Sequence, residues 1–166
     1  TPGGVSHPYT WNPANGPADV TYNWNTGMLW VMDVAQDDCI HEVDPSSGVT
    51  GNTICPSFGT SERGLAYDPA TDTYLAGGWN DLTIFRFAPD GTILEQVSVG
   101  LPIAGLAYNP DTAHLFVMVN GSPNSVYVLD AANNYAVVGQ FSVSEGFGDY
   151  SGAGLEIDCD GNLWAV

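Results

Sequence analysis

Basic residues are almost missing from this chain of 166 residues. Lysine is absent, and Arg63 and Arg86 are the only basic side chains apart from three histidines. Against 19 acidic residues this leaves a formal net charge of −17, which repels phosphate backbones and excludes nucleic acid as an expected partner. Charged residues make up only 13% of the chain, and many aspartates stand in turn sequences such as DPATD and DCDGN. Because such aspartates bond the local backbone, the acidic excess by itself names no partner.

Long hydrophobic runs and helical patterns are also missing. No apolar run reaches the roughly 18 residues that a membrane-spanning helix needs, and the N-terminus lacks a basic and apolar signal-peptide pattern. Glycine and proline occupy 31 of the 166 positions, and no window of a dozen residues keeps apolar spacing of three and four. We therefore expect an all-β protein without a membrane span, present as a mature chain or as a fragment.

Cysteine is scarce, but its placement is informative. Cys39 and Cys55 end the segment CIHEVDPSSGVTGNTIC, a predicted hairpin whose turn centres on Ser47, eight residues from each cysteine. Opposed residues of an antiparallel pair come close enough to form a disulfide, so we predict a Cys39–Cys55 bond and an oxidising compartment outside the cytoplasm. The alternative is two buried free thiols. Cys159 either pairs with something outside these residues or stays free.

A repeated segment dominates what the sequence does contain. The stretch from Gly64 to Asp90, which begins GLAYDPATDTYLAGG, returns from Gly105 to Asp130 as GLAYNPDTAHLFVMV, 41 residues later. Two weaker copies are ADVTYNWNTGMLWVMD upstream and GLEIDCDGNLWAV at the end. Spacings of 45, 41 and 49 residues result when the copies are aligned at Tyr22, Tyr67, Tyr108 and Ile157. Short strands in a repeat of this length are typical of β-propeller blades.

Each blade is predicted to hold short strands rich in Val, Ile, Trp and Tyr and bounded by Asn, Asp, Gly or Pro. In the first blade these are Asp19–Asn23, Met28–Asp33, Cys39–Asp44 and Thr50–Ile54. In the second they are Gly64–Tyr67, Thr73–Gly77, Leu82–Phe87 and Ile93–Val99. In the third they are Gly105–Tyr108, His114–Val119, Ser125–Asp130 and Val137–Val143. The fourth begins with Leu155–Asp158 and Leu163–Val166.

These strands predict one incomplete propeller domain of four-stranded antiparallel blades, with about three and a half blades present. The predicted parts are a lead-in segment 1–17, which adds an outer strand to another blade in one interpretation, then blade 1 at 18–58, blade 2 at 59–100, blade 3 at 101–145 and the first half of blade 4 at 146–166. Propellers close as rings of roughly four to eight blades. The segment is therefore expected to be part of a longer chain, or to be completed by a second copy that covers the open apolar edge.

The blades resemble NHL and YVTN-type propeller repeats of secreted bacterial proteins. The residues that carry the resemblance are GLAYDP and GLEIDCDGNLWAV as inner strand, turn and second strand, with VYVLD as third strand. The run GLPIAGLAYNPDTAHLFVMVN looks like the propeller region attached to extracellular subtilisin-type peptidases, and the resemblance covers about Ala18 to Val166. It implies the propeller fold and no particular activity, and it places any catalytic domain outside these residues.

Few motifs suggest chemistry. Asp158, Asp160 and Asn162 alternate like calcium ligands, but the chain enters a strand where a calcium loop needs a further Glu, so a plain turn is the preferred interpretation and no cofactor is expected. None of the three histidines stands at metal-ligand spacing from another His or Cys. No GxSxG elbow exists, so no hydrolytic nucleophile is named.

A stronger argument for a site comes from the architecture. In a propeller, the loops that enter each blade and those that join its second and third strands gather on one face around the channel. Here these loops contain Asp19, Asp33, Asp37, Asp38, Glu62, Arg63, Trp79, Asn80, Asp81, Asn120, Asn124, Asp149 and Tyr150. We predict a binding site on this loop face formed by Glu62, Arg63, Trp79, Asn80, Asp81, Asp149 and Tyr150. Arg63 would fix a polar ligand and the aromatic rings would hold a sugar or peptide. Alternatively, Arg63 pairs with acids of a neighbouring blade and Trp79 packs between sheets.

Three functions remain open from the sequence. The preferred one is a non-catalytic module of a secreted bacterial protein that binds a protein, peptide or glycan on its loop face. The second is a propeller enzyme, a metal-dependent lactonase, hydrolase or lyase, whose metal would be held by Asp33, Glu62, Asn120 and Asp149. The third is a structural or assembly subunit whose exposed edges pair with another chain by strand addition.

Overall fold

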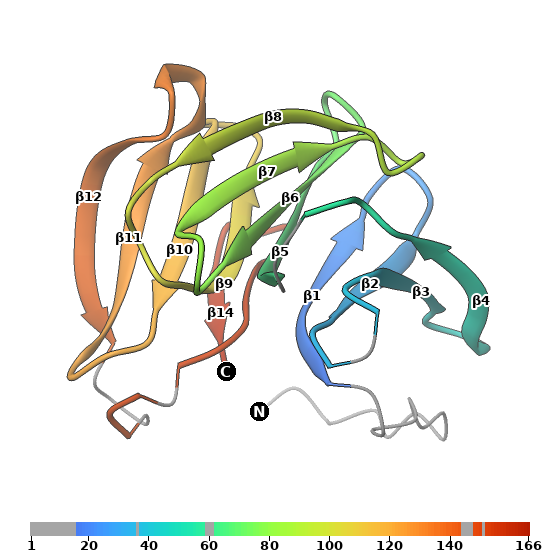
Figure 1. Cartoon of the computed structure of the whole chain (residues 1–166), viewed down its shortest axis with the longest axis horizontal. Coiled ribbons are helices and arrows are strands. Elements are labelled where there is room, and N and C mark those ends of the chain that lie inside the picture. Colours follow the sequence, from blue (N-terminus) through green and yellow to red (C-terminus); the bar gives the residue numbers. More distant parts are fainter. Residues whose placement is uncertain (1–15, 36, 59–61, 144–147, 151) are drawn as a thin grey trace.

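The computed structural model describes residues 16–35, 37–58, 62–143, 148–150 and 152–166. Three four-stranded antiparallel sheets and one hairpin follow one another along the chain (Figure 1). The first sheet holds β1 (Pro17–Asn23), β2 (Met28–Asp33), β3 (Ile40–Asp44) and β4 (Gly48–Ile54). The second holds β5 (Glu62–Asp68), β6 (Thr73–Gly78), β7 (Thr83–Phe87) and β8 (Ile93–Ser98). The third holds β9 (Ile103–Asn109), β10 (His114–Val119), β11 (Asn124–Asp130) and β12 (Ala136–Val143), and the hairpin holds β13 (Leu155–Ile157) and β14 (Leu163–Ala165).

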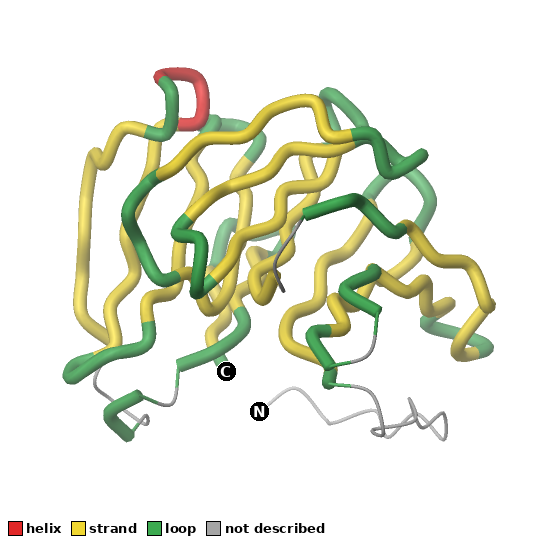
Figure 2. The backbone as a smooth tube through the Cα atoms, in the orientation of Figure 1, coloured by secondary structure: helices red, strands yellow, loops and turns green. Residues whose placement is uncertain are grey.

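Strand order equals chain order in every sheet, as the repeat predicts for propeller blades. The first strands of the sheets lie together at the centre, where β5 packs between β1 and β9, and β13 packs on β9 (Figures 1 and 2). We refer to the three sheets as blades 1 to 3 and to the hairpin as half-blade 4. The predicted all-β class and the four-stranded antiparallel blades are confirmed.

The apolar core lies between successive blades. Side chains such as Trp30, Phe58 and Phe87 fill the space between blades 1 and 2, and Leu75, Ile103 and Leu106 are fully buried in the cluster between blades 2 and 3. A third cluster joins blade 3 to half-blade 4. No sheet buries both faces by itself, so the stacking of neighbours supplies the hydrophobic stabilisation.

The same turn follows the first strand of each repeat. The residues after the aligned position each accept a hydrogen bond of 3.0 Å from the backbone N–H two residues further on; they are Asn23, Asp68, Asn109 and Asp158. Short Asx side chains favour such turns because they replace a backbone acceptor. The interpretation of many aspartates as turn residues is thereby confirmed.

One carboxylate lies among the first strands. Asp19 Oδ2 accepts hydrogen bonds of 2.9 Å from the N–H groups of both Leu65 and Leu106, which come from blades 2 and 3. Its Oδ1 accepts from Val20 N at 3.0 Å. Asp19 was predicted both as the first residue of a strand and as part of the loop before it. It lies within β1 and is buried, and burial raises its pKa well above the usual value despite these backbone donors.

The other three repeats carry glycine at the position of Asp19. A Cβ atom at Gly64 would lie 2.6 Å from Leu106 Cγ, and one at Gly154 would lie 2.8 Å from Asp19 Oδ1. At Gly105 it would collide with the carbonyl oxygen of Ala153. Gly64 and Gly105 therefore allow the first strands to approach one another closely, and Gly154 leaves room for the Asp19 side chain.

Two predictions about individual residues are confirmed. Cys39 and Cys55 form a disulfide with Cα atoms 4.3 Å apart, next to the paired residues Ile40 and Ile54, while Cys159 is an exposed free thiol. Arg86 pairs with a carboxylate of the neighbouring strand β8, because its Nε lies 3.7 Å from Glu95 Oε2, and its Nη1 also lies 2.8 Å from Asp68 Oδ2 at the end of β5.

Other predictions differ from the structure or lie outside the described residues. A 3₁₀ helix at Ala131–Asn133 was not expected; it begins at Asp130, whose side chain accepts from Ala132 N. The predicted lead-in segment falls mostly within residues 1–15, which lie outside the described residues, and β1 already begins at Pro17. Among the described residues, no helix is both long and apolar enough to cross a membrane.

Candidate functional site

The two ends of the first strands differ in how the chain continues. At one end lie the loops that enter each blade and those that join its second and third strands. At the other end lie the turns that join the first and second strands, such as the turns at Trp24 and Pro69. We refer to these as the loop face and the turn face. Candidate binding residues occur at both.

Arg63 and Trp79 form the most distinct feature of the loop face. The guanidinium carbon of Arg63 lies 5.2 Å from the centre of the Trp79 ring, a distance at which a cation is attracted to the aromatic face. Arg63 is exposed, and no carboxylate of the described residues forms an ion pair with it. Trp79 is partly buried against the cluster between blade 3 and half-blade 4, so the ring is held in place. Trp79 therefore packs against the core, as the alternative interpretation expects, whereas the ion pair which that interpretation expects for Arg63 is not found among the described residues.

Two predicted carboxylates lie next to this pair. Glu62 precedes Arg63 and is fully buried, and its Oε2 approaches the position a Cβ atom would take on Gly78. Asp81 Oδ1 approaches the same position, so the two carboxylates lie close together beside the β6–β7 turn. Asp81 also accepts a hydrogen bond from Thr83 N at 3.3 Å, while Asn80 is exposed. The turn thus carries Trp79, Asn80 and Asp81 in one short stretch.

Asp149 and Tyr150 form a second group on blade 3. Ser122 donates to Asp149 Oδ2, and the N–H of Tyr150 donates to the carbonyl of Gly121 at 2.7 Å. The β10–β11 loop also holds the connector through Asn120 and Asn124, whose side-chain amides donate to the carbonyls of Gly152 and Gly148. The Tyr150 side chain remains 68% exposed. These contacts fix the connector on blade 3 and leave the phenol ring available.

The proposed metal ligands of the enzyme hypothesis take part in different local networks. Asn120 and Asp149 lie at the connector, whereas Glu62 lies beside Asp81. Asp33 belongs to a third group, in which one ligand atom each of Asp33, Asp37 and His41 lies within 4.8 Å of the others. This group was not predicted from the sequence, where His41 stands at no metal-ligand spacing from another His or Cys and only its distance from aspartates would have indicated the group.

Asp33, Asp37 and His41 all form hydrogen bonds within and around the loop after β2. Asp33 Oδ1 accepts from Gly16 N at 3.2 Å and from Ala35 N at 2.8 Å. Asp37 Oδ1 accepts from Cys39 N at 3.1 Å and lies 3.2 Å from His41 Nε2. Three oxygen and nitrogen ligands of this kind suit a divalent cation, but the hydrogen bonds account for the arrangement by themselves.

The calcium candidates near the end of the chain form a hydrogen-bonded turn. Asp158 accepts from Asp160 N at 3.0 Å and from Asn162 N at 2.8 Å through Oδ1. Its Oδ2 accepts from the Asn162 side chain at 3.0 Å and from Trp164 Nε1 at 2.8 Å. These donors lower the pKa of Asp158 to about 2, so its carboxylate stays ionised in this turn.

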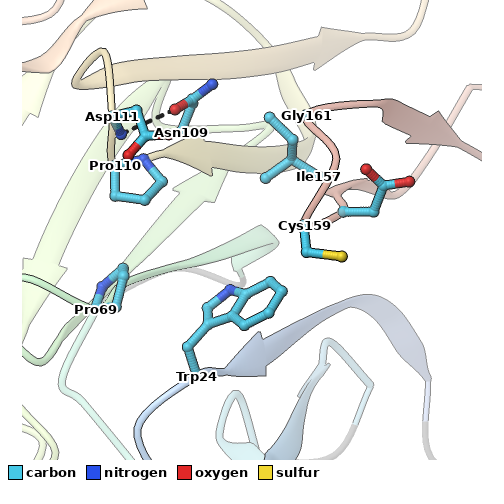
Figure 3. Close-up of a pocket in the computed structure, with 9 residues that line it drawn as sticks. Trp24, Pro69, Asn109, Pro110, Asp111, Ile157, Cys159 and Gly161 are labelled. Carbon is cyan, nitrogen blue, oxygen red and sulfur yellow. Dashed lines mark hydrogen bonds between the residues drawn. The ribbon is translucent and has the colours of Figure 1, made fainter.

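A cavity of about 200 Å³ opens on the turn face, where the turns of all four repeats meet (Figure 3). Each repeat contributes the residue two positions after the aligned tyrosine or isoleucine; these are Trp24, Pro69, Pro110 and Cys159. The Trp24 side chain is 46% exposed, and its ring faces the space between Pro69, Pro110 and Cys159 (Figure 3). The alignment of the four repeats contained this signal, because equivalent positions of successive blades lie around the same axis. From the sequence, the only candidate on this face was the calcium set Asp158, Asp160 and Asn162, of which Asp158 lines the cavity.

A second cavity, of about 340 Å³, lies between blade 1 and half-blade 4. Its walls include Val20 and Val31 of blade 1 and Gly154 and Val166 beside the hairpin. Val20 and Val166 are 39% and 73% exposed. This apolar gap differs from the other blade contacts, which are filled by buried side chains.

Glu156 lies beside the same gap. It is largely buried on β13, and burial raises its pKa to about 7, although Thr21 and the backbone of Tyr22 on β1 offset part of the effect by hydrogen bonding. Its charge in turn contributes to the raised pKa of Asp19. Two carboxyl groups therefore lie where half-blade 4 meets blade 1.

Comparisons with solved structures support the fold. The chain is similar to hydrazine synthase from Kuenenia stuttgartiensis, with 18% identity, a TM-score of 0.63, and coverage of 91% of this chain and 42% of that one. It is also similar to glutaminyl cyclase from Myxococcus xanthus, with 15% identity, a TM-score of 0.70, and coverage of 92% and 61%. A Bacteroides caccae protein of unknown function matches at 17% identity and a TM-score of 0.66, with coverage of 90% and 55%.

These similarities define the class of protein as β-propeller. At such low identity they show the fold alone. The chain spans about two fifths to three fifths of the length of these structures, so it corresponds to part of a propeller. No family model matches the chain, and no curated protein matches it in sequence.

Proposed function

We propose that this chain is part of a non-catalytic propeller module of a secreted bacterial protein, and that its loop face binds an acidic group of a peptide or glycan. The observation that carries the proposal is the exposed Arg63 guanidinium over the Trp79 ring, with its central carbon 5.2 Å from the ring centre. An arginine held over an aromatic ring offers the hydrogen-bond donors of its planar guanidinium in a fork, which suits a carboxylate ligand.

The rarity of arginine strengthens this argument. Arg63 and Arg86 are the only Arg or Lys residues, and Arg86 is used within blade 2, where it contacts Asp68, Thr73 and Glu95. With a net charge of −17, the protein repels acidic ligands at long range, so binding depends on a local cation. Arg63 is the residue that can supply it. The exposed ring of Tyr150 adds a further flat surface for a sugar or peptide.

Secretion is supported by the disulfide. Cys39 and Cys55 form a disulfide. Disulfides persist in oxidising compartments and are rare in proteins of reducing ones. The narrower resemblance to the propeller of subtilisin-type peptidases remains an expectation from the sequence. The three structures named above have other functions or none assigned.

A partner that completes the propeller is favoured by a separate observation. The apolar gap between blade 1 and half-blade 4 is lined by the exposed Val20 and Val166 and the partly buried Val31, and β14 has no strand paired on its outer side among the described residues. The matched structures extend well beyond the part that this chain covers. Further strands, from the same polypeptide or from a second copy, would pair with β14 and cover the valines.

The proposed ligand is tested with two matched pairs of probes. One pair is a short peptide with a free C-terminal carboxylate and the same peptide as an amide; the other is an oligosaccharide of uronic acids and its neutral counterpart. Calorimetric titration is expected to show that at least one acidic probe binds about tenfold more tightly than its neutral partner.

Variants then locate the binding. Arg63→Gln and Trp79→Phe are expected to weaken binding of the acidic probe. Asn134→Ala, on the exposed turn at the end of the 3₁₀ helix, is expected to leave that binding unchanged. Equal binding of acidic and neutral probes, or unchanged binding by Arg63→Gln, would contradict the proposal. A stoichiometric divalent ion in the purified protein together with hydrolytic turnover would favour the enzyme hypothesis instead.

A further inference from the structure

The turn-face cavity holds a combination of groups that the loop-face proposal does not use. Its wall includes the Trp24 indole, which is 46% exposed although it lies where four turns meet. Large aromatic side chains are normally buried, and an exposed one inside a concave site is a frequent feature of ligand sites. The Trp24 ring contacts Tyr22 edge to face at 5.0 Å, which holds the indole in position.

The remaining walls are compact and apolar. Pro69, Pro110 and Ile157 line the cavity and offer no hydrogen-bond donors from their side chains. A volume of about 200 Å³ accommodates a ligand headgroup of a few heavy atoms and excludes a whole protein domain. The cavity is therefore suited to a small ligand, or to a small headgroup of a larger ligand, that enters from the turn face.

The charges at the cavity all have one sign. Asp111 and Asp158 are among its lining residues, and no lysine, arginine or histidine is among them. Arg63 lies near the start of β5 at the opposite face, and Arg86, which contacts Asp68 and Thr71 of the β5–β6 turn, is neutralised there by Asp68 and is not among the lining residues. The carboxylate of Asp158 keeps its charge because its pKa is lowered to about 2 by hydrogen bonds from Trp164 and Asn162. An aromatic face combined with fixed negative charge attracts cations and repels anions.

We propose that the turn-face cavity, formed by Trp24, Pro69, Pro110 and Ile157 with Asp111 and Asp158 at its edge, binds an organic cation of the quaternary ammonium class. The methyl groups of such a cation contact the indole and proline surfaces, and its charge is stabilised by the indole face and by the two carboxylates. A simple inorganic ion gains little there, because the apolar walls do not replace its water shell.

Choline and 3,3-dimethyl-1-butanol provide the test, because they have nearly the same shape and differ in charge. Both are titrated into the protein labelled with ¹⁵N while amide chemical shifts are followed. Choline is expected to bind with a Kd in the millimolar range, roughly 1 to 10 mM, and the neutral alcohol about tenfold more weakly. The shifted amides are expected at the four turns around residues 24, 69, 110 and 159.

Three variants separate the contributions. Trp24→Ala is expected to reduce choline binding at least tenfold, and Asp111→Asn about threefold, while Tyr150→Ala at the loop face is expected to have no effect. Trp24 is on an exposed turn, and the unchanged amide spectrum of the variant away from the cavity would show that it folds. Because Tyr150 and Arg63 lie outside the cavity, failure of the loop-face proposal leaves this one intact.

Several results would overturn the proposal. Equal affinity for choline and the neutral alcohol would show a purely apolar cavity. Shifts confined to other surfaces, or no shifts at about 20 mM choline, would show that no cation site exists at the turn face. Undiminished binding by Trp24→Ala would exclude the indole as the recognition element.

Discussion

Blade 1 and blade 2 are built from the same four-stranded plan, but they are held together differently. Blade 2 lies between two neighbours, and β6 is buried along its whole length. Blade 1 has a filled interface on one side only, and the central residues of β4 are exposed. The disulfide of the chain joins β4 to the start of β3 in blade 1. A blade with neighbours on both faces is stabilised by burial, whereas one with an open face gains from a covalent link.

The largest effect is expected where blade 2 meets blade 3. In Gly64→Ala the new Cβ atom would lie 2.6 Å from Leu106 Cγ and 3.1 Å from the backbone of Gly105, so the two first strands must separate. We expect a loss of about 3 kcal/mol or more in the free energy of unfolding, measured by denaturant titration.

Gly139→Ala is the matched control for this substitution. Gly139 lies on the outer strand β12, and a Cβ atom there would contact the Val128 side chain at an ordinary 3.6 Å. A change within about 0.5 kcal/mol is expected. If both variants were equally stable, the close approach of the first strands at Gly64 would be refuted.

Removal of the disulfide tests the other half of the comparison. Reduction, or the double substitution Cys39→Ser with Cys55→Ser, is expected to lower the free energy of unfolding by about 2 to 4 kcal/mol, the usual scale for a loop of this size. Hydrogen exchange should accelerate in β3 and β4 and remain slow in β6 and β7, because only blade 1 depends on the bond. Unchanged melting under reductant would contradict this role of the bond.

Smaller pH effects are expected at the contact between half-blade 4 and blade 1. The pKa of Glu156 is raised from 4.5 to about 7 by burial, so the folded state prefers the neutral carboxyl group. A raised pKa contributes stability that is complete below the unfolded value and is lost as the pH rises through the folded value. The loss between about pH 5 and about pH 8 is expected to be on the order of 2 kcal/mol.

The comparison with Glu156→Gln isolates this effect from the general repulsion of an acidic protein. The amide keeps the size of the side chain and cannot ionise, so the difference in unfolding free energy between wild type and variant is expected to grow with pH. A difference that stays constant from about pH 5 to about pH 8 would show that Glu156 does not carry the raised pKa.

The repeat pattern was sufficient to predict most of the fold. It placed all the first strands, and the Asn and Asp residues after them set the turns through local hydrogen bonds that depend on few neighbours. The disulfide followed from the equal distance of Cys39 and Cys55 from the turn. Local chemistry of this kind can be read directly from a sequence.

Long-range arrangements could not be predicted in the same way. The position of Asp19 depends on the N–H groups of Leu65 and Leu106, which come from other blades. The grouping of Asp33, Asp37 and His41 depends on the path of the loop after β2. At the loop face, the residues predicted as one site lie in two local groups, one around Trp79 and one around Tyr150, and whether a ligand contacts both stays a prediction.

The central claim is that the repeats surround one axis occupied by the Asp19 carboxylate, and amide NMR tests it most directly. The N–H groups of Leu65 and Leu106 both lie 2.9 Å from Asp19 Oδ2, although they are 41 residues apart in sequence. A cross-peak between these two amide protons is expected in a nuclear Overhauser spectrum, together with slow exchange that becomes fast in Asp19→Ala. Absence of the cross-peak in a folded sample, with rapid exchange of both amides, would contradict the arrangement.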